Sequence, residues 1–203
     1  MVCDMLVDQQ GRVYRSRFYE AVIRSAARLT YDEVADALIA RKAKVRARLA
    51  DHLEALERLH SVYQCLAAAR AQRGAIEFET LESKIVFGPD LKIDRVEAVR
   101  RNDAHRLIEE CMIAANVCAA RFLARHRAPA PFRVHEPPKA DKLAQLTDFL
   151  KPLGLRLGGG KEPRPSHYAS LGRRAHKRPD ADVIATMMLR SLPQARYAAG
   201  CDG

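Results

Sequence analysis

Three residues of one predicted helix, His105, Glu109 and Glu110, carry side chains suited to metal or acid–base chemistry. His105 and Glu109 are four residues apart, so they share a helix face and could act as metal ligands or form a local hydrogen-bonded or ionic pair. The local pair is the more common explanation of such spacing. Glu109 and Glu110 are adjacent and point about 100° apart on a helix, so they cannot by themselves form a paired-carboxylate catalytic site.

No complete catalytic motif accompanies these residues. The sequence contains no P-loop, Rossmann glycine fingerprint, HExxH or GxSxG pattern. Gly158-Gly159-Gly160-Lys161 lacks the spacing of a phosphate-binding loop, and we interpret it as a surface linker. Acidic residues at predicted helix starts, such as Asp180 and Asp182, are explained by capping and by the helix dipole.

The basic residues indicate a polyanionic partner. Lys and Arg exceed Asp and Glu by 35 to 25, a formal net charge of +10. Charge alone does not separate nucleic acid from an anionic membrane, and any one cluster of cations can be a solvated face. Three clusters together favour a surface that follows phosphates. They are Arg41, Lys42, Lys44, Arg46 and Arg48; Arg95, Arg100, Arg101 and Arg106; and Arg173, Arg174, Lys177 and Arg178.

Aromatic residues near turns and helix starts could stack on the bases of a single strand. Tyr31, Phe78 and Phe87 lie at such places, and core packing is the alternative for the two phenylalanines.

Composition places the chain among folded proteins of a reducing compartment. The 203 residues suffice for one domain, with 48% apolar and 30% charged residues. No apolar run is long enough to cross a membrane, and the N-terminus does not resemble a signal peptide. The five cysteines are odd in number and have no CxxC spacing, and we expect Cys111 and Cys118 to pack as small apolar side chains. These features predict a cytoplasmic protein.

The pattern of elements predicts an α+β fold in which hairpins and long packed helices follow one another along the chain. Thr30-Tyr31-Asp32-Glu33 has the form of a capping box, and Gly74 is a plausible helix stop. The tail from Ala198 to Gly203 shows no periodicity. The expected elements are a hairpin within 1–25, helices over about 45–70, 103–124, 140–150 and 181–192, a second hairpin within 75–99, a short strand over 132–135, and a helix after Pro165.

Several segments in order resemble a known family. They are Met1-Val-Cys-Asp-Met5, Phe18-Tyr-Glu-Ala-Val22, Ala27-Arg-Leu-Thr-Tyr31, Arg101-Asn-Asp-Ala-His-Arg-Leu-Ile-Glu-Glu-Cys-Met-Ile-Ala-Ala-Asn116, Phe132-Arg-Val-His-Glu-Pro-Pro138 and Met188-Leu-Arg-Ser191. With these segments the chain resembles the RNB catalytic domain of the ribonuclease II family, in its bacterial ribonuclease R branch. The resemblance runs from residue 1 to about residue 197.

The resemblance implies a processive, Mg²⁺-dependent 3′→5′ exoribonuclease that releases nucleoside 5′-monophosphates. The implied partner is single-stranded or structured RNA, with no role for DNA or a membrane. Tyr31 matches the family's residue that distinguishes ribose from deoxyribose, and Glu109 matches the glutamate that contacts the sugar near the 3′ end. Phe78 most nearly matches the aromatic that clamps the terminal bases. Arg101 and Arg106 of the second basic cluster complete the expected RNA-binding set.

The sequence also departs from the family pattern. The aspartate cluster that holds the family's Mg²⁺, the Ser-Pro-Ile-Arg-Arg-Tyr motif and the OB-type domains have no counterpart here. We therefore expect residues 1–197 to form a partial catalytic domain lacking its N- and C-terminal parts, and residues 198–203 to form an aberrant or unstructured tail. We expect this chain to be inactive alone, and its unpaired strand edge to lower its solubility.

Two hypotheses follow. The chain is a segment of an exoribonuclease, or it is a non-catalytic RNA-binding or assembly module derived from the same domain. The net charge supports both equally. The nucleotide sequence on either side of the reading frame distinguishes them, because coding for the missing family motifs there would favour the enzyme.

Overall fold

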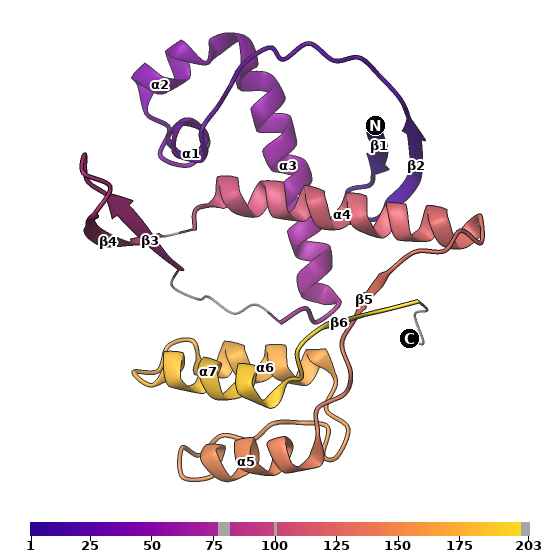
Figure 1. Ribbon diagram of the computed structural model, residues 1–203, viewed down its shortest axis with the longest axis vertical. Coiled ribbons are helices and arrows are strands. Elements are labelled where there is room, and N and C mark those ends of the chain that lie inside the picture. Colours follow the sequence, from indigo (N-terminus) through magenta and orange to yellow (C-terminus); the bar gives the residue numbers. More distant parts are fainter. Residues whose placement is uncertain (77–81, 100, 200–203) are drawn as a thin grey trace. The chain divides into compact units, whose positions relative to one another are not determined.

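The computed structural model describes residues 1–76, 82–99 and 101–199. Contacts divide the chain into two compact units. Figure 1 labels the helices and strands in chain order. Unit 1 consists of Met1–Ala69 and Glu79–Ala119, and unit 2 consists of Arg70–Phe78 and Ala120–Gly203. Helices and short antiparallel sheets occur in both, which confirms the expected α+β class. None of the described helices is long and apolar enough to cross a membrane.

Unit 1 contains two β-hairpins and the longer helices. Both predicted hairpins form where alternating residues flank a turn, although residues 77–81 of the range predicted for the second hairpin lie outside the described residues. The elements that begin in unit 1 are β1 (Val2–Val7), β2 (Val13–Tyr19), α1 (Tyr31–Leu38), α2 (Ala43–Arg48), α3 (Ala50–Gln72), β3 (Glu82–Phe87), β4 (Ile93–Val99) and α4 (Asp103–Arg125).

The turn between β1 and β2 lies against α3. Gly11 has φ +71°, and a Cβ added there would overlap the carbonyl oxygen of Cys65 and stand 2.8 Å from Cβ of Ala69. Only glycine fits both the backbone angle and the close approach. Burial raises the pKa of the Cys3 thiol on β1, and the neighbouring Cys118 thiol of α4 adds to the shift. The first hairpin is thereby fixed to the helices of its own unit.

The expected long helix over 45–70 is interrupted in the structure. α2 ends at Arg48, and Leu49 has φ −97° and ψ 17° before α3 begins. The interruption buries the Leu49 side chain, and Arg46 Nη1 donates to the carbonyl oxygen of Ala37 at 3.1 Å. The prediction of one helix was wrong: the apolar period continues through Leu49, but the backbone leaves the helical conformation there and α2 packs against α1.

Unit 2 is built around three helices of similar length. The predicted helix over 140–150 is confirmed, and proline at the first position of the next helix matches the geometry of a helix start. The elements are β5 (Phe132–Val134), α5 (Ala140–Leu150), α6 (Pro165–Ala175), α7 (Ala181–Ser191) and β6 (Arg196–Ala198). Strands β5 and β6 pair antiparallel, so Ala198, predicted to open an aperiodic tail, is the last residue of a strand.

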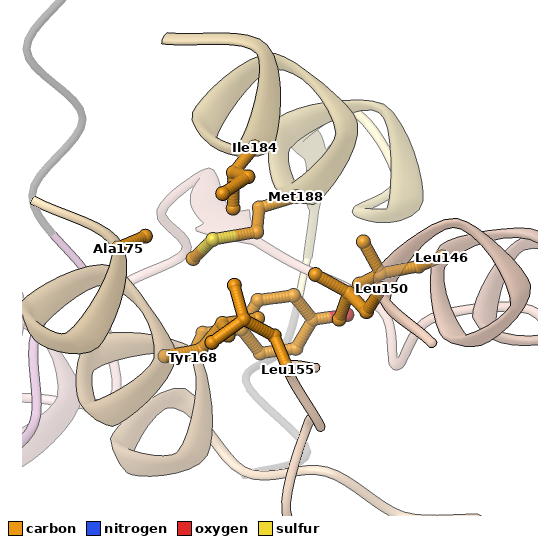
Figure 2. Close-up of a cluster of buried hydrophobic side chains, with 8 residues drawn as sticks. Leu146, Leu150, Leu155, Tyr168, Ala175, Ile184 and Met188 are labelled. Carbon is orange, nitrogen blue, oxygen red and sulfur yellow. The ribbon is translucent and has the colours of Figure 1, made fainter. Parts of the chain in front are cut away.

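The core of unit 2 is one continuous apolar cluster. Leu150, Leu155 and Met188 gather around the ring of Tyr168, whose side chain is 1% exposed (Figure 2). Ser191 Oγ donates to the carbonyl oxygen of Met188 at 2.7 Å, so the Tyr168 hydroxyl donates to Ser191 Oγ at 2.9 Å. This chain of hydrogen bonds satisfies the phenol inside the core.

Candidate functional site

The described site residues converge where α1 and α4 begin in unit 1. Thr30 caps α1, because Thr30 Oγ1 accepts from the Glu33 backbone N–H at 3.3 Å and Glu33 Oε2 accepts from the Thr30 N–H at 2.9 Å. This confirms the predicted capping box. The hydrogen bond from the Thr30 backbone lowers the pKa of Glu33. The cap fixes the orientation of the first helical residue, Tyr31.

Asn102 performs the same task for α4 and joins the two helix starts. Asn102 Oδ1 accepts from the backbone N–H groups of Ala104 at 3.1 Å and His105 at 3.3 Å. Asn102 Nδ2 donates to Asp32 Oδ1 at 3.2 Å. One amide side chain therefore holds the first turn of α4 beside the first turn of α1.

The ring of Tyr31 stacks on the ring of His105. The ring centroids are 4.0 Å apart and the planes differ by 23°. His105 Nδ1 lies 2.8 Å from Asn102 Oδ1, so the edge of the imidazole is held as well as its face. Tyr31 remains 45% exposed. The Tyr31 phenol is thus held at the surface by the His105 ring, which Asn102 holds in turn.

Glu109 lies one helical turn beyond His105 on the same face of α4 and forms an ion pair with Arg101. The contacts that the structure shows for these two side chains are to other residues, because His105 lies against Asn102 and Glu109 pairs with Arg101. Arg106 lies 3.2 Å from Asp103 on the first turn of α4. The structure therefore brings Tyr31, Glu109 and Arg101 to the same region and adds His105.

One predicted site residue could not be placed, and two residues of the site were not predicted. Phe78 lies outside the described residues. Asn102 and the stacking role of His105 were not predicted, although an Asn-Asp pair before a helix is a capping signal that could have identified Asn102.

The residues that the structure describes contain no group of three His, Cys, Asp or Glu side chains able to hold a metal ion. Glu109 is engaged by Arg101, Asp32 by Asn102 and Glu33 by Arg48. This donor set does not fit a Mg²⁺ site built from clustered carboxylates.

The positive charge is divided unequally between the two units. Unit 1 contains 17 Lys and Arg and 17 Asp and Glu, whereas unit 2 contains 18 and 8. In unit 1 three of the five cations of the first basic cluster are ion-paired, with Lys42–Asp36 at 2.8 Å, Arg46–Glu57 at 2.9 Å and Arg48–Glu33 at 2.6 Å. The net charge of +10 therefore belongs to unit 2, although two of the three sequence clusters lie in unit 1 and only the third, Arg173 to Arg178, lies in unit 2.

Comparisons with known proteins agree with the resemblance. The RNB domain family matches residues 1–201. Ribonuclease R of Vibrio cholerae is 48% identical over 199 residues, which are 98% of this chain and 24% of that protein. Ribonuclease R of Escherichia coli is 45% identical over 197 residues, with 97% and 24% covered. The chain thus spans about a quarter of the length of these relatives.

The fold is also found among solved structures. Mycoplasma genitalium RNase R in complex with ribose methylated single-stranded RNA matches with a TM-score of 0.85 and 24% identity, over 97% of this chain and 31% of that one. Its apo form matches with a TM-score of 0.86. Because the family profile covers nearly every residue and relatives share almost half of their aligned positions, this chain belongs to the RNB domain family.

Proposed function

We propose that this chain supplies the sugar-recognising part of a ribonuclease R-like 3′→5′ exoribonuclease, which degrades RNA to nucleoside 5′-monophosphates. The observation that carries the proposal is the fixed Tyr31–His105 stack beside Glu109 on α4. Membership of the RNB domain family supports it, since the relatives in that family are ribonuclease R.

The geometry suits recognition of a ribose. A phenol can donate to or accept from a 2′-hydroxyl, and a carboxylate can accept from it. The 2′-hydroxyl is the group that marks RNA. Tyr31 is exposed yet orientationally fixed, so forming that hydrogen bond costs little side-chain entropy. Arg101 pairs with the Glu109 carboxylate, and Arg106 pairs with Asp103 on the first turn of α4. Phe78 is proposed to stack on the terminal bases.

Mg²⁺ is proposed for the whole enzyme and not for these residues alone. In such an enzyme the metal would activate water and stabilise the leaving oxygen. Because the carboxylates described here do not fit a metal cluster, we propose that residues 1–197 are a partial RNB domain that does not hydrolyse RNA by itself. The cytoplasm is the compartment proposed for this activity.

The test is a hydrolysis assay beside a binding assay. A 5′-labelled single-stranded RNA is incubated with the 203-residue chain and Mg²⁺, and binding of the same RNA is measured by fluorescence anisotropy in EDTA. We expect binding that weakens with salt and no ladder of shortened products. Processive shortening from the 3′ end that chelation abolishes and that survives Glu109→Ala would contradict the proposed inactivity. No RNA binding at low salt would contradict the proposed function itself.

A further inference from the structure

An open groove of about 1490 Å³ lies within unit 2. It is bounded by β5 and the segment after it, by the segment that leads into α6, and by the C-terminal end of α7 with the residues that follow. Small-molecule pockets have volumes of about 300–1,000 Å³, so this groove suits a longer ligand.

Four cations from three separate segments line the groove, and all four are exposed: Arg133, Lys161, Arg164 and Arg190. Within the part of the chain that the structure describes, none of the four lies in an ion pair with a carboxylate. The acidic Glu136, which also lines the groove, is neutralised by Arg196 at 2.7 Å. Glu162, which is exposed beside Lys161, also lines the groove, so the lining keeps an excess of cations over carboxylates. Unit 2 as a whole carries 18 Lys and Arg against 8 Asp and Glu.

The walls of the groove are stiff. Tyr168 contributes to the lining and is anchored by its hydrogen bond to Ser191 in the core. Proline limits backbone freedom before any ligand binds, which lowers the entropic cost of binding. The prolines of the lining are Pro137, Pro138, Pro163, Pro165 and Pro193.

We propose that this groove binds the phosphodiester backbone of single-stranded nucleic acid through Arg133, Lys161, Arg164 and Arg190. A positively charged groove that follows a flexible strand is a common way to hold single strands without reading sequence. The described lining contains two aromatic rings, that of Tyr168, which is buried, and that of His135, which is exposed. One exposed imidazole stands against four exposed cations, so the contacts we propose are to phosphates rather than to bases. The groove also does not distinguish ribose from deoxyribose. This inference rests on the proposed function, and it adds a second contact region that sets affinity while Tyr31 and Glu109 set sugar preference.

The test measures binding of one mixed-sequence oligonucleotide to the 203-residue chain, as RNA and as DNA, by fluorescence anisotropy in EDTA at several salt concentrations. The groove variant is Arg133→Gln with Arg190→Gln. The matched control is Arg173→Gln with Lys177→Gln, which removes the same charge from exposed residues of unit 2 outside the lining. Arg133→Lys with Arg190→Lys keeps the charge, and thermal melting checks that every variant folds.

The groove variant is expected to weaken binding of RNA and DNA alike by about tenfold. Its slope of log affinity against log salt should fall by about 1.4, because each phosphate contact on a single strand contributes about 0.7. The control and the Arg→Lys variant should change affinity by less than about threefold, which is roughly 0.65 kcal/mol.

Several results would overturn the inference. Equal weakening by the groove and control variants would show that bulk charge, not the groove, binds the strand. Loss of RNA binding with DNA binding intact would show that the groove reads the sugar. Displacement of the oligonucleotide by polyglutamate as efficiently as by unlabelled DNA would show an acidic peptide site. Unaltered binding by the groove variant would remove this inference and leave the proposed function standing, whereas no binding by the unmodified chain would remove both.

Discussion

The proposed sugar preference depends on single side chains, because the groups at this site able to meet a 2′-hydroxyl are few and fixed. The Tyr31 ring lies on His105, and the Asn102 amide holds that imidazole. The phenol oxygen is therefore the part of Tyr31 that a ligand can use, while the ring is already committed to packing.

Removing this oxygen tests the assignment directly. Tyr31→Phe keeps the stacked ring and is expected to reduce the preference for RNA over DNA of the same sequence by about five- to tenfold, the effect of one lost hydrogen bond. Fluorescence anisotropy with both oligonucleotides measures it. Tyr14→Phe on β2, where the side chain is 68% exposed, is the matched control and should leave the preference unchanged. An unaltered preference in Tyr31→Phe would remove the phenol from the proposed site.

A buried, hydrogen-bonded tyrosine hydroxyl contributes to the free energy of unfolding, whereas an exposed one does not. Tyr168 donates to Ser191 inside the core of unit 2, and burial raises the pKa of the phenol. Tyr168→Phe is expected to lower the free energy of unfolding by about 1 kcal/mol, because Ser191 Oγ loses its donor. Urea denaturation measures the loss. Tyr197→Phe, whose side chain is 68% exposed, should be neutral, and a neutral Tyr168→Phe would mean that the bond adds no net stability.

At the scale of elements, helix starts determine where the site forms. The capping box fixes the first turn of α1, and Asn102 fixes the first turn of α4. Both caps are local hydrogen-bond patterns, yet the link from Asn102 to Asp32 connects segments 70 residues apart.

Breaking the cap of α1 has a pH-dependent consequence. Thr30→Ala is expected to lower the free energy of unfolding at neutral pH by about 1 kcal/mol, as for other lost N-caps. The pKa of Glu33 is lowered in the folded state, so its contribution is present above the pKa of the unfolded glutamate. This contribution disappears as the pH falls through the folded pKa. The difference between wild type and Thr30→Ala should therefore shrink in acid.

Urea denaturation at neutral and acidic pH measures this difference. Thr186→Ala on α7 is the control, because its exposed hydroxyl donates only to the carbonyl oxygen of Asp182. That variant should stay within about 0.5 kcal/mol of wild type. A Thr30→Ala effect that is constant with pH would contradict the coupling to Glu33.

At the scale of the whole molecule, the two units differ in core and in charge. Unit 2 has a continuous cluster of large buried side chains and all of the excess positive charge. Unit 1 buries mostly smaller side chains, such as Ala37, Ala104 and Ala114, and its charges balance.

Truncation of a core side chain in unit 2 should therefore destabilise mainly that unit. Ile184→Ala is expected to cost about 2–5 kcal/mol, because the Ile184 side chain is fully buried. Hydrogen exchange measured by mass spectrometry should show faster exchange in peptides from α5, α6 and α7 than in peptides from α1 and α3. Val183→Ala, at a position that is 55% exposed, should leave exchange unchanged. Equal acceleration in both units would show that they unfold together.

The sequence by itself determined the elements whose causes are local. The capping box at Thr30, the helix over 140–150, the proline-led α6 and both hairpins depend on residues that are neighbours in the chain. The family resemblance could also be recognised from the sequence, because its motifs occur in the family's order along the chain. The family match confirmed it.

Only the tertiary structure decided the features that depend on contacts between distant segments. The pairing of Arg196–Ala198 with β5 and the stack of His105 on Tyr31 join residues that no short sequence pattern connects. The helix break at Leu49 was likewise not visible in the sequence. The same is true of charge. The basic clusters visible in the sequence include cations that acidic neighbours balance, whereas the four cations of the groove come from three segments and meet only when unit 2 folds. Electrostatic fields depend on distance in space, so a count along the chain could give the net charge but not its location.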